Sequence, residues 1–116
     1  MKDNPVLVRT VDELRKATRD HGATIWRDVA ERLERSRKNW AEVNLSRLAR
    51  TAKKGETCAV PGVLLGTGAV TVPLTVAAFR VSAKARSKIE AAGGRVLDLT
   101  ALAKEAPKGT NVRIVG

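Results

Sequence analysis

Cysteine, histidine and aromatic residues are scarce in this sequence, and each shortage excludes a class of protein. The 116 residues contain one cysteine, Cys58, and one histidine, His21. A single cysteine cannot form an intrachain disulfide, and one cysteine with one histidine cannot make the usual Cys/His zinc site. The sequence therefore excludes a disulfide-stapled secreted domain, and we expect no metal and no cofactor.

Long apolar runs and a leader pattern are also missing. The longest apolar stretch, 70–79, contains two threonines and Pro73. It falls far short of the ~20 residues that a membrane helix needs. The opening residues carry Asp3 and Pro5 where a signal peptide would have an apolar core. We therefore expect a soluble, intracellular protein.

Acidic residues are too few to balance the basic ones. Lys and Arg total 22 against 12 Asp and Glu, which gives a net charge of +10 and a pI near 10.7. Such an excess causes self-repulsion and is typical of proteins with a polyanionic partner, either nucleic acid or an acidic membrane face. The surplus is +6 in residues 1–54 and +4 in 55–116, so neither part is a free basic tail.

The pattern changes near Gly55, which divides a single domain, 1–116, into a helical basic part, 1–54, and a second part, 55–116. Three helices are expected in the first part: about 11–21, ended by Gly22; about 25–35; and one from Asn44, a reasonable N-cap, to Gly55. The second has an apolar stripe at helical spacing: Trp26, Val29, Ala30 and Leu33. Its other face carries acid-first i, i+4 pairs: Asp28–Arg32, Glu31–Arg35 and Glu34–Lys38.

The second part alternates short apolar runs with helical segments. Strands are expected at 57–60, 75–81, 95–97 and 112–115, and helices at 83–92 and 99–106. Pro61-Gly62 is expected to form a turn, and Gly66, Thr67 and Gly68 a loop. Strands that alternate with helices predict an α/β core.

The densest basic segment contains Arg32, Arg35, Arg37 and Lys38. It is either a solvated helix end, because three of these bases follow an acid by one turn, or a binding surface. Trp40 lies just beyond it and either stacks on a nucleotide base or fills the core, and we slightly favour the core.

Two further basic sets contain no acid within their span: Arg47, Arg50, Lys53 and Lys54; and Arg80, Lys84, Arg86 and Lys88. The second set surrounds a helix start capped by Ser82, where the helix dipole disfavours cations but favours a bound phosphate. A solvated basic face is the alternative for both sets.

Catalysis has little support. Cys58 lies in an expected strand as a small apolar residue, and His21 lies at a helix end. No carboxylate pair has a spacing that calls for acid–base chemistry. The glycines of 62–68 match neither phosphate-loop pattern and favour tight turns and close packing. We therefore predict that the protein is not an enzyme.

Three segments carry a resemblance to a known family. Residues 31–48, ERLERSRKNWAEVNLSRL, closely resemble the signature of the archaeal and eukaryotic large-subunit ribosomal protein eighteen-e family. The segment 61–68, PGVLLGTG, resembles its central glycine segment, and 81–96 resembles a segment shared with bacterial ribosomal protein fifteen. The chain departs from the family at Trp40, where Arg or His is expected.

The resemblance implies a fold and a role. The fold is α/β, with a helical N-terminal part followed by an irregular strand and helix core of the ribosomal protein fifteen/eighteen-e type. The role is that of a structural constituent of the large ribosomal subunit, ribosome-associated in the cytoplasm and without enzymatic activity. An N-terminal segment is implied to reach into RNA, and the short chain is of archaeal rather than eukaryotic type.

The expected partners are large-subunit ribosomal RNA and neighbouring large-subunit proteins, with no membrane and no small-molecule substrate. The predicted rRNA-binding residues are Lys2, Arg9, Arg32, Arg35, Arg37, Lys38, Trp40, Asn44, Arg47, Arg50, Lys53, Lys54, Arg80, Lys84, Arg86 and Lys88. Two alternatives stay open: a free-standing RNA-binding protein or RNA chaperone outside the ribosome, and a small enzyme that uses Cys58 or His21.

Overall fold

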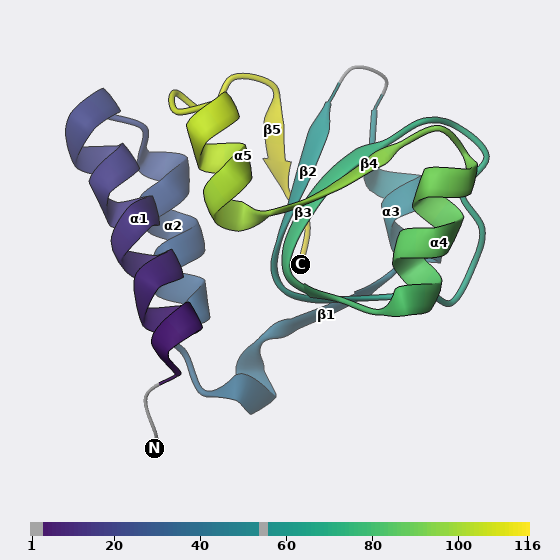
Figure 1. The fold of residues 1–116 in the computed structure, drawn as a ribbon, viewed down its shortest axis with the longest axis horizontal. Helices are drawn as coiled ribbons and strands as arrows, with labels where there is room; N and C mark the ends of the chain where they lie inside the picture. The colour runs from purple at the N-terminus through teal and green to yellow at the C-terminus, as the bar shows by residue number, and fades with distance from the viewer. Residues whose placement is uncertain (1–3, 54–55) are drawn as a thin grey trace.

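The structure is a computed structural model that describes residues 4–53 and 56–116 (Figure 1). The described elements, in chain order, are α1 (Pro5–His21), α2 (Thr24–Leu33), the 3₁₀ helix η1 (Arg37–Asn39), β1 (Ala41–Asn44), α3 (Leu45–Thr51), β2 (Thr57–Leu65), β3 (Thr75–Val81), α4 (Ala83–Ala91), β4 (Arg95–Asp98), α5 (Leu99–Glu105) and β5 (Val112–Ile114). The α/β fold class is thus confirmed.

The five strands form one sheet in which every pairing is parallel. The order is β1-β2-β3-β4, and β5 also pairs with β2. Strands β1 and β5 share one edge of β2, because β1 pairs with Gly62–Leu65 and β5 with Thr57–Ala59. A parallel sheet needs both faces covered, and here helices lie on both sides of it.

Alternate residues of the central strands face two separate helix layers. In β2, Ala59 packs in the core beneath α1, α2 and α5, whereas Cys58 and Val60 pack in the core beneath α3 and α4. In β3, Ala77 and Val76 divide in the same way. Because side chains alternate along a strand, one continuous apolar run supplies both cores. Figure 1 shows α1, α2 and α5 on one flank of the sheet and α3 and α4 on the other.

Helix α1 begins at Pro5, six residues before the predicted start at Val11. The Asn4 side chain caps it by accepting hydrogen bonds from the backbone N–H groups of Val6 at 2.9 Å and Leu7 at 3.3 Å. Asparagine at the cap with proline at the first helical position is a strong start signal that the prediction did not use. From Pro5 onward the N-terminal segment is therefore a packed helix and not an extended arm. The predicted stop at Gly22 is confirmed, with φ of 70°.

Helix α2 buries the predicted stripe of Trp26, Val29, Ala30 and Leu33. It ends at Leu33, two residues earlier than predicted. Of the three predicted ion pairs, the described residues form only Asp28–Arg32, at 3.0 Å. Because Arg35 and Lys38 lie beyond the helix end, the i, i+4 geometry is lost for them, and Glu34 pairs with Arg15 of α1 instead.

The segment from 41 to 65 differs most from the prediction. Residues Ala41–Asn44 form a strand that was not expected, and α3 ends at Thr51 rather than at Gly55, which lies outside the described residues. Strand β2 continues through Pro61-Gly62, where a turn was predicted, with a shift of register against β3 between Val60 and Val63. A side chain at Gly62 would collide with the backbone oxygen of Ala41, so this glycine permits the close approach of β1.

The remaining elements follow the prediction to within a residue or two. Strand β3 coincides with the predicted 75–81, and α4 begins after Ser82, whose hydroxyl accepts a hydrogen bond from Ala85 N–H at 3.1 Å. The chain leaves α4 through Gly93, with φ of 85°, and the predicted strand, helix and strand follow as β4, α5 and β5.

Candidate nucleic-acid interface

The carboxyl ends of β1, β2 and β3 lie along one edge of the sheet, because the strands are parallel. Strand β1 leads directly into α3, β2 into the loop Gly66–Gly68, and β3 through Ser82 into α4. This edge is where open α/β sheets bind their ligands. Two of the predicted basic sets flank it.

At this edge the loop Gly66–Gly68, which follows β2, packs between α3 and α4. The backbone N–H of Ser46, in the first turn of α3, donates to the Thr67 carbonyl at 3.1 Å. A side chain at Gly68 would come within 2.6 Å of that N–H, and one at Gly66 within 2.8 Å of the Lys84 side chain. The first turns of α3 and α4 therefore lie on opposite sides of a three-residue loop, and the predicted close-packing role of its glycines is confirmed.

Some basic side chains on β3 and α4 are exposed to solvent, and others are hydrogen-bonded within the protein. Arg80, Lys84 and Arg86 are exposed, and Arg86 lies 3.9 Å from Glu90, at the limit of an ion pair. Lys88 is half-buried, and its ammonium donates to the carbonyls of Gly66 at 2.8 Å and Gly68 at 2.7 Å. Its hydrogen-bonding capacity is thus largely used within the protein.

The set on α3 is exposed. Arg47 and Arg50 project from the helix, and Lys53 follows its end. No ion pair of these three side chains occurs within residues 4–53 and 56–116. Lys54, the fourth predicted member, lies outside the described residues.

Asn44 precedes α3 but does not cap it with its side chain. Its amide oxygen accepts a hydrogen bond from the Thr67 N–H at 3.1 Å, so it ties the loop to the end of β1. Asn44 thus occupies the predicted N-cap position of α3, but its side chain makes no capping hydrogen bond. The contact joins residues 23 apart in sequence, and no local pattern signals it.

The segment between α2 and β1 carries three exposed bases, Arg35, Arg37 and Lys38. Arg32 differs from them, because its guanidinium donates to Asp28 at 3.0 Å and to the Gly116 carbonyl at 2.8 Å. The local helix ion pair of Arg32 was predictable, whereas Arg35 and Lys38 lose their predicted partners because α2 ends early.

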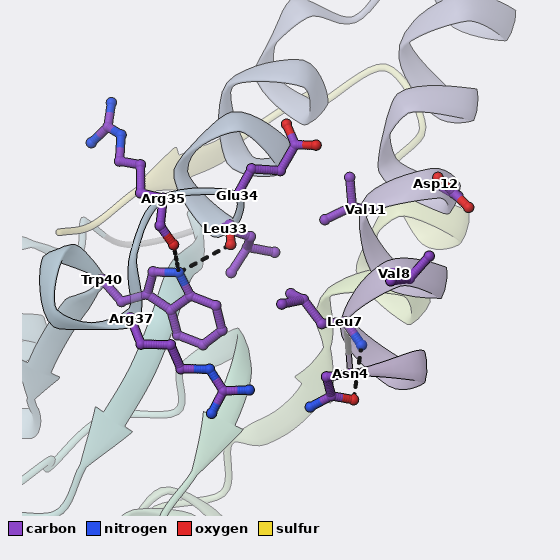
Figure 2. Close-up of a pocket in the computed structure, with 10 residues that line it drawn as sticks. All are labelled: Asn4, Leu7, Val8, Val11, Asp12, Leu33, Glu34, Arg35, Arg37 and Trp40. Carbon is purple, nitrogen blue, oxygen red and sulfur yellow. Dashed lines mark hydrogen bonds between the residues drawn. The ribbon is translucent and has the colours of Figure 1, made fainter. Parts of the chain in front are cut away.

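The ring of Trp40 is in the core, with an exposed fraction of 7%. Its indole N–H donates to the carbonyls of Leu33 at 3.0 Å and Arg35 at 3.1 Å, as the dashed lines in Figure 2 show. It meets Phe79 edge to face at 5.3 Å, and the Arg37 guanidinium lies 5.1 Å from the ring centre. The core interpretation of Trp40 is the one observed, and this burial leaves little of the ring for base stacking.

Trp40 closes one end of a small pocket between α1, α2 and η1 (Figure 2). The pocket has a volume of ≈ 270 Å³, and its apolar wall includes Leu7, Val11 and Leu33. Arg35 lines the rim through its backbone, and in this view its guanidinium points away from the pocket. The arginines of this region thus face solvent around a mostly apolar depression.

Arg9, predicted to reach RNA, lines a small pocket with Phe79 near the end of β3 and Asp98 at the end of β4. Arg9 is exposed on α1, which packs against α2 and α5 in the other helix layer. Lys2 lies outside the described residues. The structure therefore brings Arg47, Arg80, Lys84 and Arg86 together on the side of α3 and α4, whereas Arg9 lies on the side of α1.

The groups considered for catalysis are separated from this edge. Cys58 is fully buried, and burial raises the pKa of its thiol to about 11. His21 is exposed at the end of α1. None of the helices in the described ranges has the length and apolar character to cross a membrane.

Fold and surface together define a small basic α/β protein with several exposed Arg and Lys side chains at the carboxyl edge of its sheet. The family model described as ribosomal protein 60S L18 and 50S L18e matches residues 3–116, so the chain belongs to this family. Members of this family are structural components of the ribosome and not enzymes.

Several archaeal proteins are similar to this chain over nearly its whole length. The large ribosomal subunit protein eL18 of Methanopyrus kandleri is 47% identical to this chain. The aligned region covers 97% of this chain and 92% of the Methanopyrus kandleri protein. The proteins of the same name from Halobacterium salinarum and Archaeoglobus fulgidus are 46% and 45% identical and cover 98% of this chain and 97% of theirs. The family resemblance and the archaeal type expected from the sequence are confirmed.

Proposed function

We propose that this protein is a structural constituent of the large ribosomal subunit that binds its ribosomal RNA through the carboxyl edge of the sheet. Family membership supports the ribosomal role. The RNA contact rests on one observation: Arg47, Arg80 and Lys84 are exposed around one loop without an ion-pair partner in the described chain. Their charge is uncompensated where a ligand has access.

The binding mechanism is electrostatic. Each lysine or arginine neutralises a phosphate of the RNA and releases a counterion, and the rigid sheet fixes the positions of these side chains. Folded RNA is read mostly through its backbone and shape, which suits exposed Arg and Lys side chains held on helices. Arg86, Arg50 and Lys53 extend this surface along α4 and beyond α3, and Arg35, Arg37 and Lys38 form a second basic surface beside η1.

Two matched triple variants test the location of the interface. Arg47→Ala/Arg80→Ala/Lys84→Ala removes three bases from the proposed surface. The control, Arg19→Ala/Arg27→Ala/Lys104→Ala, removes two arginines and one lysine that are exposed on the other helix layer. Both lower the formal net charge of +10 by three.

Binding to a large-subunit rRNA is then measured as a function of salt concentration. The first variant is expected to lower the magnitude of the slope of log K against log salt by about 2–3, since each phosphate contact contributes about 0.7–0.9. The control is expected to change this slope by less than the contribution of one phosphate contact. Equal effects of the two triples would contradict an interface at this edge.

Sedimentation separates the ribosomal role from a free-standing RNA chaperone with the same bases. We expect one copy per cytoplasmic large subunit, and we expect it to sediment with the subunit at moderate salt. Recovery of the protein only in the ribosome-free fraction would contradict the proposal and favour the chaperone.

A further inference from the structure

We infer that Lys88 and Asn44 are positioning residues that act on RNA through the loop Gly66–Gly68. The inference rests on the proposed function and assigns these two residues a different role from direct phosphate contact. The geometry behind it is a set of four hydrogen bonds that tie three consecutive residues of the loop to three different elements.

The first part of the argument concerns the loop carbonyls. Lys88 donates to the carbonyls of Gly66 at 2.8 Å and Gly68 at 2.7 Å, and the Ser46 N–H donates to the Thr67 carbonyl at 3.1 Å. All three carbonyl oxygens are therefore held by donors of the protein. Because carbonyl oxygens repel phosphate, turning them inward leaves the outer side of the loop compatible with a polyanion.

The second part concerns the helices on either side. Asn44 accepts from the Thr67 N–H at 3.1 Å, which fixes the loop to the end of β1 and thus to the start of α3. Lys88 fixes the same loop to α4. The closest approaches, from Gly68 to Ser46 and from Gly66 to Lys84, allow no side chain at either glycine. The loop therefore sets the separation between Arg47 on one side and Lys84 on the other.

The third part concerns charge. In the described part of the chain Lys88 has no acidic partner, and its ammonium is held by neutral carbonyl groups. Its positive charge thus lies behind the loop, where it adds to the potential of the surface without touching a ligand. A lysine is suited to this because one flexible stem places several donors on neighbouring acceptors.

The experiment compares four single variants in rRNA binding and in the amide exchange rate of Thr67 in the free protein. Asn44→Ala removes the acceptor of the Thr67 N–H without changing the net charge, and Asn39→Ala, at an exposed asparagine of η1, is its neutral control. Lys88→Met removes the two carbonyl contacts, and Lys84→Met removes an exposed base one turn earlier on the same helix.

We expect Asn44→Ala and Lys88→Met to speed Thr67 exchange and to weaken rRNA binding by about tenfold, equivalent to about 1.4 kcal/mol. For Asn44→Ala the salt slope should stay unchanged. Lys84→Met should leave Thr67 exchange unchanged and lower the salt slope by about one. Lys88→Arg, which keeps the charge and donors, should restore part of both properties.

Two results would overturn the inference. Faster Thr67 exchange with unchanged rRNA affinity would make the bonds purely structural. Weaker affinity with unchanged exchange would make Asn44 and Lys88 direct RNA ligands. If Lys88→Met does not fold, Asn44→Ala alone decides between these outcomes. Failure of the proposed function is distinguishable, because the Arg47/Arg80/Lys84 triple variant would then bind like its control.

Discussion

The two helix layers of this protein differ in how their charges are balanced. Helices α1, α2 and α5 carry seven Lys or Arg and six acids, whereas α3 and α4 carry five Lys or Arg and a single acid, Glu90. In the first layer, Lys16 pairs with Asp20 at 2.6 Å and Arg32 with Asp28 at 3.0 Å. In the second, the one contact of this kind within the described residues is Arg86–Glu90, at 3.9 Å.

Under the proposed function, this difference assigns stability to the first layer and binding to the second. Both layers bury an apolar core against the same sheet, but the two tryptophans lie only in the core of the first. The first layer thus combines large buried side chains with nearly balanced charge, and the second leaves most of its charge unbalanced. An average over the whole sequence hides this division, since the excess is similar in residues 1–54 and 55–116.

The largest expected effect comes from the first layer. Trp26 is fully buried, and its indole N–H donates to the carbonyls of Ala106 and Pro107, both at 3.1 Å. Trp26→Ala is expected to lower the free energy of unfolding by about 3–5 kcal/mol, measured by denaturant titration. The rRNA affinity of the folded fraction should not change. Loss of rRNA affinity in a folded variant would contradict the assignment of stability and binding to different layers. Trp26→Phe provides the milder variant if Trp26→Ala does not fold.

A smaller effect is expected where β1 meets β2. Gly62→Ala places a side chain against the Ala41 backbone oxygen, so β1 must move, at a cost of about 1–3 kcal/mol. Because β1 leads into α3, this substitution should also weaken rRNA binding, unlike Trp26→Ala. Thermal unfolding and rRNA binding measure the two effects. A fully stable Gly62→Ala protein would contradict the close approach of the strands.

Acid should weaken two ion pairs that involve strands β4 and β5. Arg113 donates to both carboxylate oxygens of Glu56, at 2.8 and 3.0 Å, and this lowers the Glu56 pKa. Arg95 lowers the pKa of Glu105 in the same way. Each pair stabilises the protein above the ordinary Glu pKa of about 4.3, and this contribution is lost as the pH falls through the lowered value.

The thermal midpoint followed from neutral pH to acid measures this loss. Glu56→Gln and Glu105→Gln should each flatten the dependence on pH, and the double variant should flatten it further. Because Glu105 lies on α5 in the other helix layer, Glu105→Gln should not lower the rRNA affinity at neutral pH. An unchanged acid profile in the double variant would contradict the pairing.

The smallest effect concerns Cys58. Its thiol is buried in the core of the second layer, and burial raises its pKa to about 11. Alkylation of the native protein at a pH near the ordinary thiol value of about 8.5 should therefore be slow and should accelerate on unfolding. Cys58→Ala should bind rRNA like the unchanged protein. Fast labelling of the native thiol would reopen the possibility of a reactive site.

The parts of the fold that sequence reasoning recovered are those with strong local signals. The stripe of α2, the buried run of β3 and the cap at Ser82 each follow from residues close together in sequence. The start of α1 was missed although Asn4 and Pro5 carry a local signal. Strand β1 was missed for a physical reason, since four residues with one buried position, Val43, gain their structure only from pairing with β2.

The bases of the candidate surface could be named from the sequence, but their geometry could not. Arg47, Arg80 and Lys84 were identified from the absence of nearby acids, and that pattern is visible in the sequence. The roles of Asn44 and Lys88 were not, because their partners in the loop lie about twenty residues away. Side-chain contacts with backbone groups that are distant in the chain produce no periodic pattern in the sequence.

The place of β5 in the sheet has a consequence for synthesis of the chain. Val112 pairs with Thr57, so β2 cannot complete its hydrogen bonding until a segment made much later has left the tunnel of the translating ribosome. Nascent chains emerge N-terminal end first, and parallel pairing over long separations is slow. The half-finished sheet would meanwhile present an open strand and a surplus of positive charge to the crowded surroundings.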